Sequence, residues 1–322
     1  MPSSRIPGGW IVAPWFDLLF LANLAWVVLL IPGLVDSGRS GPIDFIQIYF
    51  LTTPHRWITL FLVALDPDRR SGRGRFFLGL AVIVTVAVLT LRLSTNAFLC
   101  LVLIDFVWNA WHFGSQHAGV ARIYGRKAGA APSTLEKQGM RFLVVYAILR
   151  IPEWSAGGLP EAWRAWLPLA DSLALTVPAL ILTRTLLRPN EATWGRLAYL
   201  TSVCLLYSAM ILTQTLGRST TMNALFLAAA LFHAIEYLAI VTHYARGRAE
   251  RGTACLFQRM ARHWTVVLLL YLTLWGMADW MLHHHFFEWA AGLNLGAAFL
   301  HYTYDGMIWK LRRPETARSL GV

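Results

Sequence analysis

The sequence predicts an all-α protein, a polytopic transmembrane helical bundle of about ten helices in a single domain over residues 1–322. Hydrophobic residues make up 57% of the chain and charged residues only 14%, whereas soluble domains average about 25% charged residues. The apolar residues fall in runs long enough to cross ~30 Å of hydrocarbon, which takes roughly 20 residues per helix. The basic residues fall between these runs, as expected when the lipid bilayer is the solvent.

Ten segments meet the length requirement for a membrane-spanning helix. They are residues 11–35, 43–65, 76–94, 96–120, 137–153, 167–187, 195–216, 221–245, 263–282 and 286–310. The first segment is too long for a secretory signal peptide and lacks a small-residue cleavage motif, so we expect it to be retained. No internal repeat or second domain is evident, which predicts one bundle.

The positive charges predict the orientation of the bundle. Cytoplasmic loops carry an excess of Lys and Arg, and 22 of the 28 basic residues lie before the first span or after the even-numbered spans. The clusters are residues 69–75, 122–141, 184–196, 246–262 and 310–318. Both termini are therefore expected in the cytoplasm (N-in and C-in), with the protein in the inner (cytoplasmic) membrane of a bacterium. Without the short fifth span the last two clusters would fall outside, against this rule.

The distribution of charge and the cysteine content argue against a nucleic-acid-binding protein, a disulfide-linked protein and a cysteine-rich zinc protein. The net charge of +11 could suggest a nucleic-acid partner, but the sequence has no aromatic and basic platform for one. Cys100, Cys204 and Cys255 lie far apart and form no CxxC pair, so they predict neither a disulfide framework nor a cysteine-rich zinc site.

The histidines are the most informative residues, because ionisable side chains inside a membrane are costly and usually face a partner or a cavity. Six of the ten histidines lie in even-numbered spans. Counted back from the basic clusters at about 1.5 Å per residue, four of them lie ~12 to 20 Å into the membrane, in its cytoplasmic half. His117, Glu236, His243 and Asp305 extend this layer of polar residues toward the cytoplasm. The predicted metal ligands are His55, His112, His117, His233, Glu236, His301 and Asp305.

Spacing within the helices supports joint ligation. His233 and Glu236 are three residues apart and lie on neighbouring turns of one face, in the reverse order of the Glu-x-x-His pair that di-iron bundles use. In the sequence His301-Tyr-Thr-Tyr-Asp305, the offset of four residues aligns the imidazole with the carboxylate. That pair can ligate together, or Asp305 can orient His301.

The fourth span contains a less regular pattern. Asp105 precedes His112 by seven residues, or about two turns, which favours Asp105 as a partner that orients the histidine. His117 lies five residues beyond His112, about 140° around an ideal helix. Both can ligate one centre only if Gly114 loosens the turn or if two metals are bridged.

The remaining histidines are expected to play other roles. His243 and His263 lie beside cytoplasmic arginines, where an interfacial polar role is expected. The run His283, His284 and His285 is expected in a solvated outer connection.

Imidazole and carboxylate ligands without thiolates favour non-haem iron, as one or two ions, and zinc, copper and manganese accept the same ligand types. With Tyr237, Tyr302 and Tyr304 nearby in sequence, such a centre can activate O2 beside a lipid-like chain. A cytoplasmic location gives access to a soluble electron donor.

The pattern Trp111-His112-x4-His117, with His233-x2-Glu236 and His301-x3-Asp305, resembles the histidine motifs of integral-membrane di-iron desaturases, hydroxylases and carotenoid oxygenases. The resemblance covers only the helices that carry these motifs, and His112-x4-His117 is the single good match to the histidine boxes of those enzymes. It implies oxygen-dependent oxidation of a hydrophobic substrate by an oxidoreductase. It also implies that the five histidines are ligands and that Glu236 and Asp305 are bridging or terminal carboxylates.

Three alternatives fit parts of this pattern. In a haem-binding electron-transfer protein, two histidines from facing helices would ligate the iron axially, which leaves the carboxylates unexplained. A proton- or metal-coupled transporter needs polar groups in both halves of the membrane, and the outer half offers only Asp17, Asn23 and Asp279. A metal-dependent hydrolase can use the same ligands, although the chain has no His-Glu-x-x-His motif.

Overall fold

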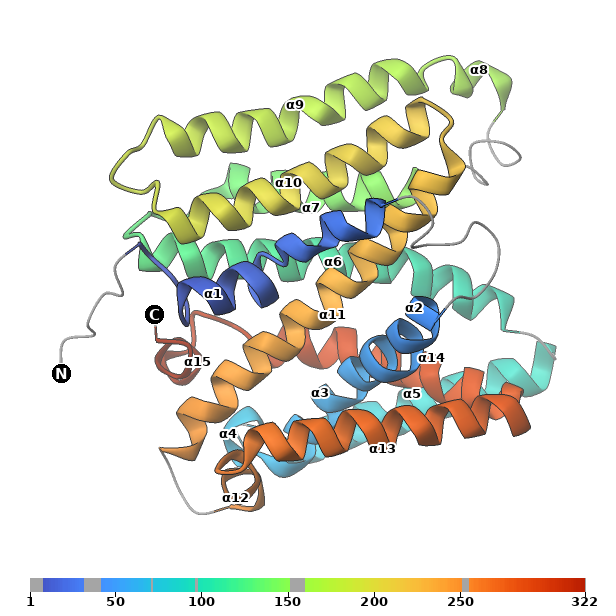
Figure 1. The fold of residues 1–322 in the computed structure, drawn as a ribbon. Helices are drawn as coiled ribbons and strands as arrows, with labels where there is room; N and C mark the ends of the chain where they lie inside the picture. The colour runs from blue at the N-terminus through green and yellow to red at the C-terminus, as the bar shows by residue number, and fades with distance from the viewer. Residues whose placement is uncertain are drawn as a thin grey trace. The chain divides into compact units, whose positions relative to one another are not determined.

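The computed structural model describes residues 8–31, 42–70, 72–95, 98–150, 160–250 and 255–321. Within these ranges all regular structure is helical and no strand occurs (Figure 1). The long helices are α3 (Thr53–Leu65), α5 (Gly74–Thr95), α6 (Leu99–Lys127), α7 (Thr134–Leu149), α9 (Leu167–Leu186), α10 (Trp194–Thr215), α11 (Ser219–Ala249), α13 (Trp264–His285) and α14 (Phe287–Ile308). The short ones are α1 (Pro14–Phe16), η1 (Asp17–Leu21), η2 (Leu24–Leu30), α2 (Pro42–Phe45), η3 (Ile46–Thr52), α4 (Pro67–Arg70), α8 (Glu161–Arg164), α12 (Leu256–Ala261) and α15 (Pro314–Ser319).

Six helical stretches among the described residues are long and apolar enough to cross a membrane. They are Ile43–Leu65, Gly74–Thr95, Glu161–Leu186, Trp194–Thr215, Thr220–Ala249 and Trp264–His285. On α5 and α13 large apolar side chains point outward, with Leu78 67%, Ile83 65% and Leu274 64% exposed. Contiguous apolar faces of this kind are rare on soluble proteins. Length, composition and exposure together indicate a membrane protein.

Each of the six stretches overlaps an expected span. The other four expected spans are 11–35, 96–120, 137–153 and 286–310, and they are not among the six. Three of them coincide with the helices α6, α7 and α14. Residues 32–35, 96–97 and 151–153 of these expected spans lie outside the described residues. The total of about ten spans stays a prediction.

The expected first span does not form one continuous helix. Asn23 adopts a left-handed conformation with φ of 45° and separates η1 from η2. The Asp17 carboxylate accepts backbone N–H groups of Ile11 (2.6 Å) and Val12 (3.0 Å) just before the helical turns begin. Asn tolerates the left-handed region, and Asp competes for backbone donors, so these two residues account for the interruption.

The chain forms two compact units. Unit 1 contains residues Met1–Ile43 and Ala110–Glu236, and unit 2 contains Asp44–Asn109 and Tyr237–Gly321. The divisions after residues 43, 109 and 236 fall inside α2, α6 and α11, so each of these helices contributes one part to each unit. The prediction of one domain over residues 1–322 stays a prediction.

In unit 1, α7, α9 and α10 pack against one another (Figure 1, green to yellow). A buried carboxylate joins them. Asp171 of α9 accepts hydrogen bonds from Tyr146 (2.6 Å) and Thr215 (2.7 Å) and forms an ion pair with Arg150 (3.1 Å). The N-terminus of α7 is capped by Ser133, whose hydroxyl accepts the backbone N–H of Glu136.

In unit 2, α14 packs against α3, α5 and α13. The core includes Phe77 against Tyr304, with ring centroids 4.9 Å apart. The π-helical turn η3 ends at Thr52, and Pro54 follows in the first turn of α3. Proline lacks a backbone N–H and cannot complete a regular ladder, which accounts for the irregular turn that precedes it. His55 directly follows this proline, at the start of the regular helix.

The Asp171 network predicts a large stability effect. Asp171→Ala leaves the guanidinium of Arg150 without its buried counter-ion, and we expect the free energy of unfolding to fall by about 3–5 kcal/mol. Thermal unfolding in detergent measures the change. Asp171→Asn keeps hydrogen-bonding capacity and should be less harmful, and a wild-type melting temperature for Asp171→Ala would contradict this role.

Candidate metal centre

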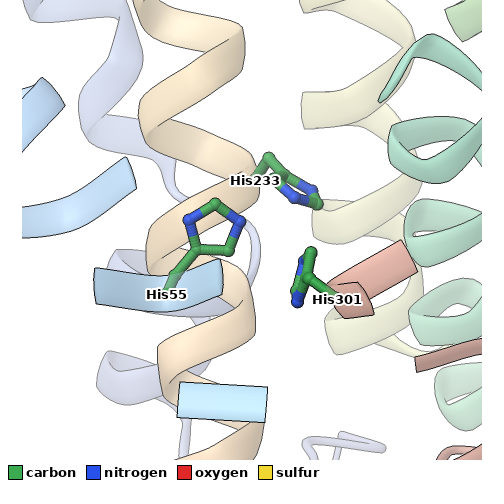
Figure 2. A group of neighbouring side chains, drawn as sticks. All are labelled: His55, His233 and His301. Atoms are coloured by element: carbon green, nitrogen blue, oxygen red, sulfur yellow. The ribbon is translucent and has the colours of Figure 1, made fainter. Parts of the chain in front are cut away.

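Unit 2 brings together two predicted histidines and a predicted carboxylate. His55 of α3 and His301 of α14 meet edge to face, with ring centroids 4.9 Å apart (Figure 2). A ring nitrogen of His55 lies within 4.8 Å of one of His301, and the same limit holds between His301 and Asp305. The Nε2 atom of His301 is 3.8 Å from Oδ2 of Asp305. We call His55, Thr59, Tyr237, His301 and Asp305 the His301 cluster.

Burial and donor chemistry make this cluster suitable for a metal ion. His55 is 2% exposed, His301 is fully buried and Asp305 is 9% exposed. Two donors on one ion, each about 2.0–2.2 Å from it, lie at most about 4.4 Å apart. The distance of 3.8 Å between His301 and Asp305 meets this limit.

A chain of hydrogen bonds connects the candidate ligands His301 and Asp305. Oγ1 of Thr59 lies 2.7 Å from Nδ1 of His301 and 2.6 Å from the Tyr237 hydroxyl. Tyr237 in turn donates to Oδ1 of Asp305 (2.7 Å), and Nε1 of Trp309 donates to the Tyr237 oxygen (3.1 Å). Thr59 and Tyr237 therefore connect the imidazole to the carboxylate.

Oγ1 of Thr59 has a single hydrogen and three neighbours, which are the Tyr237 hydroxyl, Oδ1 of Asp305 and Nδ1 of His301. When that hydrogen goes to Tyr237 or to Asp305, Nδ1 of His301 donates to Thr59 and Nε2 carries the lone pair. Metal-binding histidines use this arrangement, in which one nitrogen donates to the protein and the other ligates.

Unit 1 contains a second polar cluster, the His117 cluster, formed by Gln116, His117, Tyr199, Tyr207 and Glu236. Nδ1 of His117 lies 3.0 Å from Oε2 of Glu236 and 3.0 Å from the Tyr199 hydroxyl. Nε2 of His117 lies 3.1 Å from the Tyr207 hydroxyl. Tyr199 also donates to Oε1 of Glu236 (2.6 Å), and Gln116 donates to Oε2 (3.1 Å).

The His117 cluster is satisfied by protein groups alone. Both ring nitrogens of His117 have a tyrosine hydroxyl within hydrogen-bond distance, and Glu236 accepts from two side chains. His117 and Glu236 are fully buried, where unpaired polar groups would be costly. In this arrangement the two residues act as mutual hydrogen-bond partners, and their role as metal ligands stays a prediction.

The other two predicted ligands form a pair in unit 1. The rings of His112 on α6 and His233 on α11 meet edge to face with centroids 5.0 Å apart. His233, which is also drawn in Figure 2, stacks on Phe113 at a centroid distance of 3.8 Å. Gln116 donates to the His233 carbonyl (2.9 Å), which links the pair to the His117 cluster.

Several of these partners were not singled out from the sequence. Thr59, Gln116, Tyr199 and Tyr207 are of residue types that are common in apolar helices, and their roles depend on tertiary contacts. Thr59 and Gln116 had a local signal, since they follow His55 and His112 by four residues and so lie on the same helix face as those histidines. Asp105, expected to orient His112, accepts a hydrogen bond from Tyr302 (2.8 Å).

The histidine run has a different structure from the one expected. His283, His284 and His285 form the last turn of α13, where we expected an outer loop. Loops need residues that break a helix, and this run contains none. Nδ1 of His284 lies 3.0 Å from the Trp280 carbonyl one turn earlier, which is a local contact.

Comparisons of the chain with protein-family models, with curated proteins and with solved structures found no match. Function is therefore inferred from the chemistry of the side chains.

The His117 cluster predicts the effect of losing one hydroxyl. Tyr199→Phe removes a 2.6 Å hydrogen bond to the buried Glu236 carboxylate, and we expect the free energy of unfolding to fall by about 1–3 kcal/mol. Tyr207→Phe, which removes a contact with His117 only, should cost less. Thermal unfolding of both variants tests this order. Equal stability of Tyr199→Phe and wild type would refute it.

Proposed function

We propose that the protein is a membrane-embedded, metal-dependent oxidoreductase that uses non-haem iron to oxidise a hydrophobic, lipid-like substrate with O2. The observation that carries the proposal is the His301 cluster, where the buried His301 imidazole lies close to the His55 imidazole and also close to the Asp305 carboxylate. Two histidines with one carboxylate are a donor set typical of non-haem Fe(II) oxygenases.

The proposed ligands are His55, His301 and Asp305. Thr59 and Tyr237 hold the imidazole and the carboxylate in place through the hydrogen bonds described above. When bound there, iron would supply the one-electron chemistry that O2 needs in order to react with a C–H bond. Zinc, copper and manganese accept the same ligand types, so the identity of the metal is part of the proposal.

The proposal also includes a second iron ion in unit 1. His112 and His233 are its proposed histidine ligands, with His117 and Glu236 completing the set predicted from the sequence. Their support is the close approach of the two imidazole rings and the nearby buried carboxylate.

Hydroxylation of a substrate C–H bond by O2 balances with two external electrons and two protons. One oxygen atom enters the substrate, and the other leaves as water. O2 gains four electrons, two from the C–H bond and two from a donor. We propose a soluble protein as that donor.

The membrane topology belongs to the same proposal. Ten spans with both termini in the cytoplasm would place the basic clusters on the cytoplasmic side of a bacterial inner membrane. The metal centre would then lie in the cytoplasmic half of the membrane, where a soluble donor can approach it. The distribution of the 28 Lys and Arg residues supports this topology.

Metal content tests the proposal. We expect wild-type protein purified in mild detergent to contain about one or two iron ions per chain by elemental analysis, without a Soret band. His301→Ala and His55→Ala should each lose iron, because both remove an imidazole from the His301 cluster. His284→Ala is the matched control, since it replaces an exposed histidine of α13.

Other outcomes would select a different function. A Soret band would support a haem protein, and zinc in place of iron would support a hydrolase. If the wild type holds no metal after reconstitution, and the metal content of His301→Ala and His55→Ala is the same as that of the wild type, the proposed metal centre is wrong. A transporter is then the alternative.

The hydrogen bond to His301 provides a more selective test. Thr59→Val removes the hydroxyl while nearly keeping the side-chain volume, and loss of such a supporting group typically weakens metal affinity by about 10–100-fold. Thr59→Ser should largely restore affinity, because it keeps the hydroxyl. Iron titration of the metal-free protein measures this, and equal affinities for Thr59→Val and wild type would rule out the supporting role.

A further inference from the structure

A cavity of about 170 Å³ lies among α3, α12 and α13 in unit 2. Its walls are apolar and include Phe61, Leu65, Phe257, Trp264, Leu268 and Tyr271. The Tyr271 hydroxyl donates to the Pro54 carbonyl (2.7 Å), so its hydrogen is already used. An apolar cavity offers water too few polar partners, which favours a hydrocarbon occupant.

The size and surroundings of the cavity indicate what kind of hydrocarbon enters it. Pockets that enclose a whole drug-sized molecule measure about 300–1,000 Å³, so this smaller space suits part of one narrow chain. Next to the wall residue Leu268, Leu269 is 60% and Leu270 is 55% exposed on the outer face of α13. In a membrane protein such a face contacts lipid, whose acyl chains are therefore the available occupants.

Positive charge gathers where α12 joins α13. Arg259 and Arg262 are exposed there, and Arg259 precedes the cavity residue Met260 directly. The N-terminus of α13 adds the positive end of its helix dipole. An apolar cavity beside exposed cations matches an amphiphile with an anionic head and a hydrocarbon tail.

We propose that this cavity binds one acyl chain of an anionic phospholipid, with the phosphate of the head group near Arg259 and Arg262. The cavity residue Ile58 follows His55 on α3 by three residues, or about one helical turn. A chain held there lies beside the His301 cluster. That the bound lipid is also the substrate rests on the proposed function, whereas its binding does not.

Native mass spectrometry of the full-length protein in detergent tests the binding with phosphatidylglycerol as the probe. Leu268→Trp fills the cavity and should weaken phosphatidylglycerol binding by about tenfold or more. Leu274→Trp is the matched control, because Leu274 lies on the same helix with its side chain 64% exposed and does not line the cavity. Equal binding by wild type and Leu268→Trp would overturn the proposal.

The head group is tested separately. Phosphatidylcholine with identical acyl chains, and the double variant Arg259→Gln with Arg262→Gln, should each bind about tenfold more weakly. If phosphatidylcholine binds the wild type, and phosphatidylglycerol binds the double variant, as tightly as phosphatidylglycerol binds the wild type, the preference for an anionic head group is refuted. If the free fatty acid binds more tightly than phosphatidylglycerol, the ligand is a fatty acid and the phospholipid proposal is wrong.

A photoreactive acyl chain gives a readout that needs no variant. Phosphatidylglycerol with a diazirine near the end of its chain should crosslink wild-type protein within residues 58–65 or 257–271. Crosslinks found only elsewhere would overturn the site. Iron content, measured on the same sample, separates the two proposals, because lipid binding with no iron would contradict only the proposed function.

Discussion

The structure depends on the cost of placing polar groups in an apolar interior. A buried carboxylate or imidazole without a partner costs several kcal/mol, so each must be met by another polar group. Asp171 accepts from side chains of two neighbouring helices, and Glu236 accepts from Tyr199 and Gln116. These bonds are directional, whereas apolar packing tolerates sliding. The buried polar residues therefore fix which helices meet and at what height.

The sequence was sufficient to predict the helical class and the alignment of His301 with Asp305. Helical spacing depends only on the local backbone, so the alignment of His301 with Asp305 follows from an offset of four residues. The break at Asn23 was not predictable, because a single left-handed residue in an apolar run leaves the mean hydropathy unchanged. Tyr199 and Tyr207 were also missed, since tertiary packing alone brings their hydroxyls to His117.

The two clusters differ in how their histidines are held. His117 has hydroxyl groups at both ring nitrogens, which fixes the ring from two sides. His301 is held at Nδ1 by Thr59, and its Nε2 faces Asp305 at 3.8 Å, longer than a hydrogen bond. A ring that is oriented by one nitrogen can present the other to an ion. This difference makes the His301 cluster the stronger candidate for chemistry.

Helix α11 places the two clusters on consecutive residues, because Glu236 bonds within one cluster and Tyr237 within the other. Neighbouring residues on an α-helix point about 100° apart. Inserting or deleting one residue in the part of α11 that precedes Glu236 would rotate Glu236 by this angle relative to the start of the helix, and Glu236 would lose its partners Tyr199 and Gln116. The length of α11 is therefore constrained in a way that loop lengths are not. Changes in chain length can be absorbed where no such register exists, in the connections between helices.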